Sequence, residues 1–199
     1  MNTSMSKIEK VFIKICKNND PRIVLLRDTE VIGWIYGNMS FLPEKTSEAE
    51  NRWGRAMLKK RRPDLTLDKQ WTNKFGEHIC EEVQLLKGST FSKPDKKDNL
   101  CPDLETPDSI IEVKTCTYFT TGTANEKILG TSFKYANVPV LYGKPLQIMC
   151  IGGAEKQCIE SYGILEGGDK CTGNKILLLE WFKSIKIEYI GLTSVLNSL

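Results

Sequence analysis

Histidine is nearly absent from this chain of 199 residues, because His78 is the only one. Enzymes that bind zinc or another metal through several histidines are therefore largely excluded. A Ser-His-Asp triad would have to use His78, and no Gly-x-Ser-x-Gly motif accompanies it. Acid–base chemistry would then fall to carboxylates, lysines or metal-bound water, and we expect His78 to be structural or surface-exposed.

The cysteines also form no recognisable site. The seven of them are scattered and form no Cys-x-x-Cys pair, which argues against a zinc site and favours a reducing, cytoplasmic compartment. No run of about 18 apolar residues is present, and the first residues lack the apolar stretch of a signal peptide. We therefore expect an intracellular protein without a membrane segment.

Length and composition fit one compact domain over residues 1–199. Hydrophobic residues make up 40% of the chain and charged residues 27%, as in ordinary globular proteins. Helical spacing of apolar residues predicts helices over residues 6–18, about 46–62 and 68–86. Residues 23–42 alternate apolar runs with glycines and remain ambiguous.

The centre of the chain is richer in extended sequence. Two short strands are expected on either side of a turn at Thr106–Ser109, and residues 145–153 have the pattern of a buried strand. Further helices are expected over residues 124–129, 155–163 and 174–184, and a last strand over 185–190. Helices before and after a central β region predict an α/β or α+β fold, with a small mixed sheet flanked by helices.

The stretch from Pro102 to Lys114 carries the clearest chemistry. Strand alternation puts Glu112 and Lys114 on one face, with Ile111 and Val113 on the other. Asp103 can reach the same face as Glu112 from the neighbouring strand. Two carboxylates and one ammonium group would then meet around one point. Such a group can hold a hard divalent cation beside a cationic side chain, which is what cutting a phosphodiester bond needs.

Similar residues occur nearby, and they are weaker candidates. Asp95 and Lys97 repeat the Asp-x-Lys spacing, but they lie in a polar loop with no strand. Asp108 also follows a proline, and a tight Pro-Asp-Ser turn explains it better. Glu105 would face the same side as Asp103 if the first strand extends that far. The alternative to a site is an exposed strand edge whose charges are simply solvated.

Pro102-Asp103 followed by Glu112-Val113-Lys114 resembles the PD-(D/E)XK nuclease superfamily, most of all its type II restriction endonucleases. The resemblance is best over about 68–153, and it implies a restriction-endonuclease-like catalytic core there. By this resemblance Asp103 and Glu112 would bind Mg²⁺, with the backbone carbonyl of Val113 near the metal. Lys114 would orient or deprotonate the attacking water and stabilise the developing charge. A helical glutamate adds a further metal ligand in parts of the superfamily, and Glu77 is the candidate here.

Basic residues crowd the helix predicted over 46–62 and its end. They are Arg52, Arg55, Lys59, Lys60, Arg61 and Arg62. This stripe can lie along a phosphate backbone, or it can be a solvated helix face whose basic last turn suits the helix dipole. Lys127 and Lys134, with Glu126 and Tyr135, are further candidates for contacting DNA or supporting the site.

The resemblance implies a Mg²⁺-dependent endonuclease that cuts double-stranded DNA at a short specific sequence. A homodimer is expected, because each subunit would cut one strand of a palindromic site. A nuclease of DNA repair, recombination or branched structures on the same scaffold is one alternative, since a fold does not fix a function. A DNA-binding module without catalysis is another.

Overall fold

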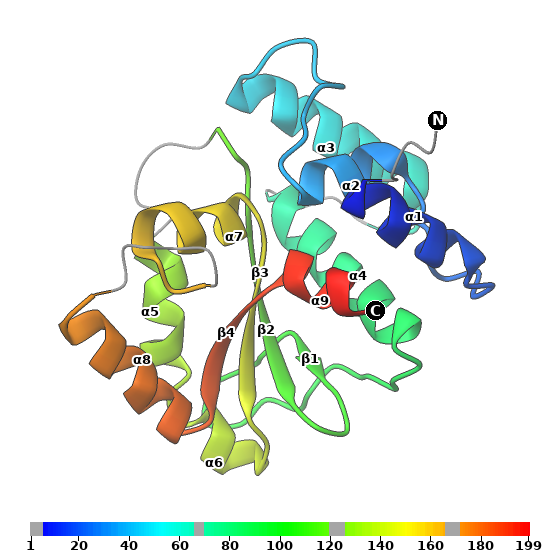
Figure 1. The fold of residues 1–199 in the computed structure, drawn as a ribbon. Helices are drawn as coiled ribbons and strands as arrows, with labels where there is room; N and C mark the ends of the chain where they lie inside the picture. The colour runs from blue at the N-terminus through cyan, green and yellow to red at the C-terminus, as the bar shows by residue number, and fades with distance from the viewer. Residues whose placement is uncertain (1–5, 66–69, 120–125, 166–171) are drawn as a thin grey trace.

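The computed structural model describes residues 6–65, 70–119, 126–165 and 172–199 (Figure 1). A four-stranded sheet lies at the centre, in the order β1-β2-β3-β4. Its strands are β1 (Leu104–Glu105), β2 (Ile110–Cys116), β3 (Leu146–Gly152) and β4 (Ile187–Gly191). β1 runs antiparallel to β2, whereas β2, β3 and β4 are parallel. The predicted class, a small mixed sheet flanked by helices, is confirmed.

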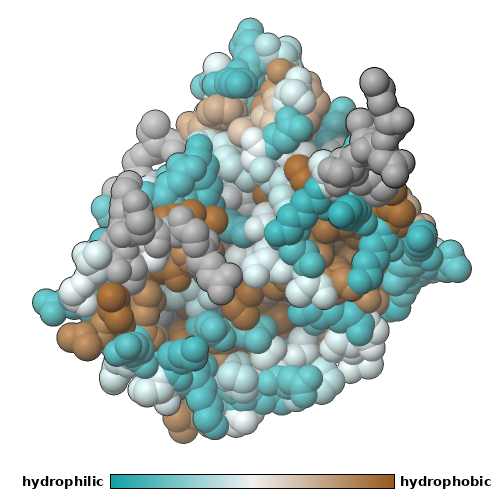
Figure 2. Space-filling model, viewed as in Figure 1, coloured by the Kyte–Doolittle hydropathy of each residue, from teal (hydrophilic) through white to brown (hydrophobic). Residues whose placement is uncertain are grey.

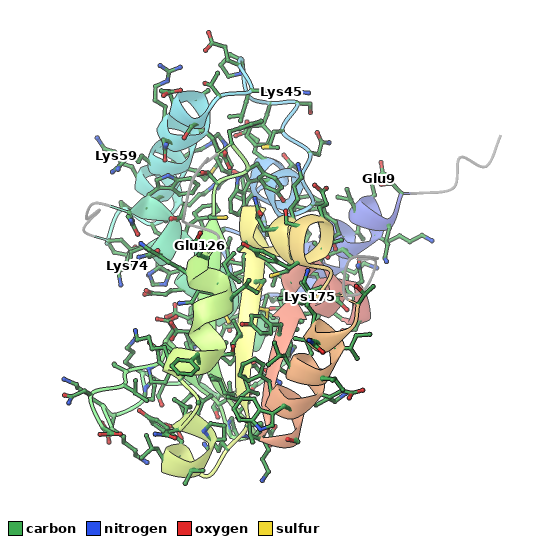
Figure 3. All side chains as sticks on the ribbon, turned by 90° about the vertical axis from the view of Figure 1, so that its left-hand side faces the viewer. Glu9, Lys45, Lys59, Lys74, Glu126 and Lys175 are labelled. Carbon is green, nitrogen blue, oxygen red and sulfur yellow. The ribbon has the colours of Figure 1, made fainter. Side chains whose placement is uncertain are left out.

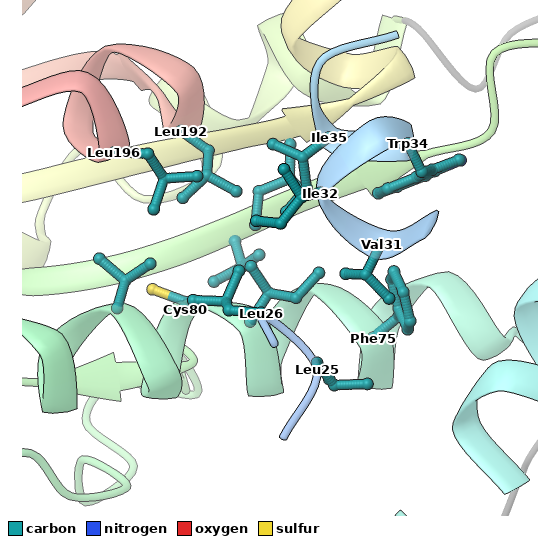
Figure 4. Packing of buried hydrophobic residues seen from close by; sticks show 14 of the residues in the cluster. Leu25, Leu26, Val31, Ile32, Trp34, Ile35, Phe75, Cys80, Leu192 and Leu196 are labelled. Carbon is teal, nitrogen blue, oxygen red and sulfur yellow. The ribbon is translucent and has the colours of Figure 1, made fainter. Parts of the chain in front are cut away.

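One face of the sheet carries the larger core. It is covered by α2 (Thr29–Ile35), α4 (Trp71–Leu86) and α9 (Leu192–Ser198), and α1 (Lys7–Lys17) and α3 (Ser47–Arg61) pack against these (Figure 1). Apolar side chains of α2, α4 and α9 meet in this core, among them Ile32, Phe75 and Leu192 (Figure 4). Ile111 and Val113 of β2 face the same core, as alternation along the strand requires.

The other face is covered by a second set of helices. They are α5 (Glu126–Lys134), α6 (Val138–Tyr142), α7 (Gly153–Gln157), the π-helical turn η2 (Cys158–Tyr162) and α8 (Asn174–Ser184). Ile110, Ile148 and Tyr189 of the sheet pack here against Ile128 of α5. Within the described ranges, no helix has both the length and the apolar character needed to cross a bilayer.

Most predicted elements are confirmed, with shifted ends. α1 and α3 begin where the predicted helices begin, and the structure shows Ser6 and Thr46 as their N-caps. α4 is described from Trp71 onward, and residues 66–69 of the predicted helix lie outside the described residues. Residues 124 and 125 also lie outside them, and the prediction that the next helix ends at residue 129 was wrong, because α5 continues to Lys134. α9 was not predicted.

A buried glutamate joins three parts of the fold near the end of β2. Glu50 of α3 accepts hydrogen bonds from the Trp34 indole at 2.6 Å and from the backbone N–H groups of Tyr118 at 2.9 Å and Phe119 at 3.3 Å. Burial raises the pKa of Glu50, and the three donors compensate for the loss of water. The segment that leaves β2 is thereby fixed against α2 and α3.

Candidate active site

Asp103 is placed by the short first strand. β1 pairs only with Ile110 and Ile111 of β2, so the residues of β2 after Ile111 do not pair with β1. Asp103 binds this part of β2 instead. Its backbone N–H donates to the Ile111 carbonyl at 3.1 Å, and its Oδ2 accepts the Val113 N–H at 2.8 Å. The carboxylate is therefore held against β2 by backbone hydrogen bonds.

Glu112 and Lys114 lie on the same face of β2, as alternation predicts. The Lys114 ammonium is 2.6 Å from Oε1 of Glu112. The Glu112 side chain is only 6% exposed, and its Oε2 is buried with no hydrogen-bond partner among the described residues. A buried carboxylate oxygen without a partner is costly. The second oxygen of Glu112 is therefore available to a cation.

The two carboxylates interact electrostatically. The pKa of Asp103 is raised to about 6, first by burial and then by the negative charge of Glu112. Glu77 raises the pKa of Asp103 further, and Lys93, whose ammonium is 3.8 Å from Asp103 Oδ1, lowers it. Neighbouring carboxylates disfavour each other's ionisation, so a bound dication would relieve the repulsion.

Asp103, Glu112 and Lys114 line a cleft of about 430 Å³. Its walls come from α3, the first turns of α4, the open edge of β2, and the start of α5. Glu77 also lines the cleft, with one oxygen 2.9 Å from the ammonium of Lys74. In Figure 3, Lys74 and Lys59 lie along one edge of the molecule. The lining of the cleft thus combines the carboxylates of Asp103, Glu112 and Glu77 with two lysines, Lys114 and Lys127.

Sequence reasoning missed a group of uncharged polar residues in the cleft. They are Asn51, Gln70, Thr72 and Asn73. The last three open α4, whose N-cap Gln70 makes no side-chain capping bond. The polar run Gln70–Asn73, broken only by Trp71, was the available signal. Amide and hydroxyl groups at a helix start can donate hydrogen bonds to an anionic ligand.

α5 and the residue after it bring two of the predicted supporting residues, Lys127 and Tyr135, to the site. Lys127 lines the cleft. Tyr135 is buried, and its pKa is raised by burial and by the charges of Glu112 and Asp103. The ammonium of Lys134 lies 4.7 Å from the centre of the Tyr135 ring and 3.3 Å from its hydroxyl oxygen. Tyr135 therefore stays protonated beside the carboxylates, with Lys134 behind it.

The basic residues of α3 divide into two groups. Four of them are exposed: Arg52, Arg55, Lys59 and Lys60. Arg61 lies 2.6 Å from Asp28, and Arg62, the residue after α3, lies 2.9 Å from Asp64. The Arg61–Asp28 pair ties the end of α3 to the N-cap of α2, and the exposed group is the better candidate for contacting a phosphate backbone.

The rival acidic residues lie apart from the cleft. Asp108 is exposed in the turn between β1 and β2, and Glu105 is bound to the ammonium of Lys144 at 2.7 Å. Lys97 donates to a carbonyl of α6 and lies over the ring of Tyr142. His78 Nδ1 is 2.5 Å from Glu81 on the same helix, which agrees with a structural role.

The donor set fits a magnesium site with few protein ligands. Among the described residues, no group of three or more His, Cys, Asp or Glu side chains is arranged to hold a metal ion. Mg²⁺ is commonly bound through one or two carboxylates, with water completing the shell. Asp103 and Glu112 are the two carboxylates of the cleft that could hold such an ion, and Val113, whose carbonyl was the expected third ligand, lies in the same wall.

No family model, curated protein or solved structure matches this chain. Its function is therefore inferred from the geometry of the cleft and from the motif on β2.

Proposed function

We propose that this protein is a Mg²⁺-dependent endonuclease that hydrolyses phosphodiester bonds in double-stranded DNA, acting as a type II restriction enzyme. The observation that carries the proposal is the open cleft on the β2 edge. Two carboxylates, Asp103 and Glu112, line it together with the ammonium of Lys114. The resemblance of this segment to PD-(D/E)XK nucleases gives the chemistry a precedent.

The metal requirement is supported by the two acids. The unpartnered Oε2 of Glu112 and the raised pKa of Asp103 both mark a place where a positive charge is lacking. Bound there, Mg²⁺ would lower the pKa of a coordinated water and neutralise charge that develops on the phosphate. Glu77 would join the ligand set if it released Lys74.

Lys114 would position the attacking water and stabilise negative charge on the phosphate. Its ammonium is now held by Glu112 at 2.6 Å, so it sits next to the metal ligand on the same strand face. Tyr135 lies close enough to both carboxylates for their charges to raise its pKa, so its hydroxyl stays neutral beside the site. Charged groups in a largely buried site act more strongly than they would in water.

The substrate class is supported by the surroundings of the cleft. Lys127 lines it, and the ammonium of the exposed Lys93 lies 3.8 Å from Asp103. The exposed Arg52, Arg55 and Lys59 of α3 continue the positive charge beyond it. Exposed cations near a cleft that contains carboxylates suit a phosphate backbone with one phosphate at a bound metal. We expect a homodimer, because duplex cleavage needs one such site per strand.

The experiment is cleavage of supercoiled plasmid and phage DNA with and without Mg²⁺, followed by mapping of the ends. We expect discrete fragments that appear only with Mg²⁺. Asp103→Asn, Glu112→Gln and Lys114→Ala should each lower the cleavage rate at least about 100-fold.

The matched control is Asp108→Asn, which alters the other Pro-Asp pair at an exposed position and should leave the rate unchanged. Equal activity of the Asp103→Asn and Asp108→Asn proteins would refute the assigned site. Cleavage confined to branched DNA would replace restriction by a structure-specific role.

A further inference from the structure

The outer surface of one sheet-covering layer is unusually apolar. Eight large hydrophobic side chains of the described residues are exposed, and all but Ile13 lie on α5, α6 and α8. We call these seven residues the outer apolar surface: Leu129, Phe133, Val140, Ile176, Leu177, Leu178 and Trp181. Figure 2 shows apolar side chains gathered at its lower left, in the region that α8 occupies in Figure 1.

α8 is the centre of this surface. None of its 11 residues is buried. Only Leu179 and Phe182 pack partly against the core beneath, whereas Leu177, Leu178 and Trp181 are 62%, 55% and 50% exposed. A helix at the surface normally has polar side chains on the face that points away from the core. α8 therefore has one covered face and one apolar face without a partner in the described chain.

α5 adds to the same side of the molecule. Its Phe133 is 82% exposed, and Val140 of the following α6 is 85% exposed. α5 and α8 cover the same face of the sheet, and the Tyr189 hydroxyl of β4 donates to backbone carbonyls of α5 (Figure 3). At these exposed fractions the outer apolar surface amounts to on the order of 700 Å², against roughly 800 Å² per partner in a standard interface.

The charges within this surface suit a second copy of the chain. Glu180 of α8 lies between Lys175 and Lys183, and all three are exposed. Two antiparallel copies of α8 related by a two-fold axis near Trp181 would bring each Glu180 toward Lys183 of the other copy, and both of these residues are exposed. Identical patches that contain both signs of charge can pair in this way, and most homo-oligomers are two-fold symmetric.

We propose that two copies of this protein associate through the outer apolar surface, with α8 packed against α8 of the second copy. This proposal rests on the proposed function in one respect, because cleavage of both strands of a duplex needs two copies. The surface itself would pair copies that have no nuclease activity equally well. α5 also contributes Lys127 and Ile128 to the cleft. The interface therefore lies on a helix that forms a cleft wall.

The test is the molar mass in solution, measured by light scattering and sedimentation across a dilution series. The wild type should be a dimer. Leu177→Glu combined with Trp181→Glu should weaken the dimer at least about 100-fold and leave the far-ultraviolet circular dichroism and thermal midpoint unchanged.

Ile176→Glu has a matched control in Ile13→Glu, because both isoleucines are 43% exposed and lie on helices of 11 residues. Only Ile176→Glu should weaken the dimer.

A monomeric wild type, an unaffected Leu177→Glu/Trp181→Glu dimer, or open-ended association would each overturn the interface. A dimer without nuclease activity would refute only the proposed function, and an active monomer only the interface.

Discussion

At the scale of single residues, the backbone rather than a side-chain network positions Asp103. Its N–H and its carboxylate both bond to β2, at Ile111 and Val113. Asp103 is thus held against Val113, which follows it by 10 residues in the sequence, and so lies beside Glu112 in space. Because burial and Glu112 both oppose its ionisation, the pKa of Asp103 is about 6 instead of 3.8.

This leads to a titration prediction for the metal-free protein. Glu112→Gln should lower the pKa of Asp103, although burial keeps it above its ordinary value. Glu77→Gln should lower it less, because the Glu77 charge is a smaller cause. Carboxyl-carbon NMR across the pH range measures both shifts. A larger effect of Glu77→Gln, or an Asp103 pKa near 3.8 in the wild type, would contradict this assignment.

The raised pKa of Asp103 also determines how the stability of the fold changes with pH. Between about pH 3.8 and 6 the folded protein holds a proton on Asp103 that the unfolded chain has released. The contribution of Asp103 to the free energy of unfolding therefore falls as the pH rises through this window. Mg²⁺ must displace the same proton, so its affinity should weaken below about pH 6.

The sequence alone was sufficient to predict that Asp103, Glu112 and Lys114 lie together, but not which other residues line the cleft. Period-two alternation put Glu112 and Lys114 on one face, and turn chemistry favoured Asp103 over Asp108, which the structure leaves exposed. Asn51 comes to the cleft from α3, distant in sequence. No local pattern encodes such an approach, because it depends on how α3 and α4 pack.

At the scale of elements, helices with one apolar face were predictable and short or fully buried ones were not. α1 and α3 have capping residues and a clear period. α2 has seven residues with Val31, Ile32, Trp34 and Ile35 all buried, so it shows no polar face from which to read a helical period. α9 is also only seven residues long, and tertiary contacts rather than sequence pattern support it.

The contact between α4 and β2 leads to a prediction about stability. A Cβ atom added at Gly76 of α4 would lie 1.9 Å from Oγ1 of Thr115 and 3.1 Å from Val113. Overpacking of this kind costs about 1–3 kcal/mol, which exceeds the gain of about 1 kcal/mol from replacing glycine in a helix. We expect Gly76→Ala to lower the free energy of unfolding in urea and to slow cleavage by moving Glu77.

Gly130 provides the control for this substitution. It lies inside α5, and an added Cβ there meets nothing within 4 Å. Gly130→Ala should therefore leave stability unchanged or raise it by up to about 1 kcal/mol. Equal destabilisation by both substitutions would show that helix packing on β2 is not the cause.

At the scale of the whole molecule, we expect DNA binding to depend on where the charges lie rather than on the net charge. The chain carries a formal charge of only +3. Arg61 and Arg62 are neutralised by Asp28 and Asp64, whereas the exposed bases of α3 lie on the helix that contributes Asn51 to the cleft. α1 lies on another side of the molecule: in Figure 3, Glu9 and Lys59 lie near opposite edges. DNA binding should therefore depend on α3 and not on α1.

Arg52 and Lys59 of α3, and Lys10 and Lys17 of α1, are exposed pairs with the same spacing of seven residues. Each pair replaced by alanine removes two positive charges, so long-range attraction to DNA falls equally. Only the α3 pair should remove direct phosphate contacts, which lowers the salt dependence of binding by about 0.9 per contact, or close to 2 in all. Fluorescence anisotropy with duplex DNA at several salt concentrations and without Mg²⁺ measures that slope. Equal slopes for the two double variants would place the DNA elsewhere than along α3.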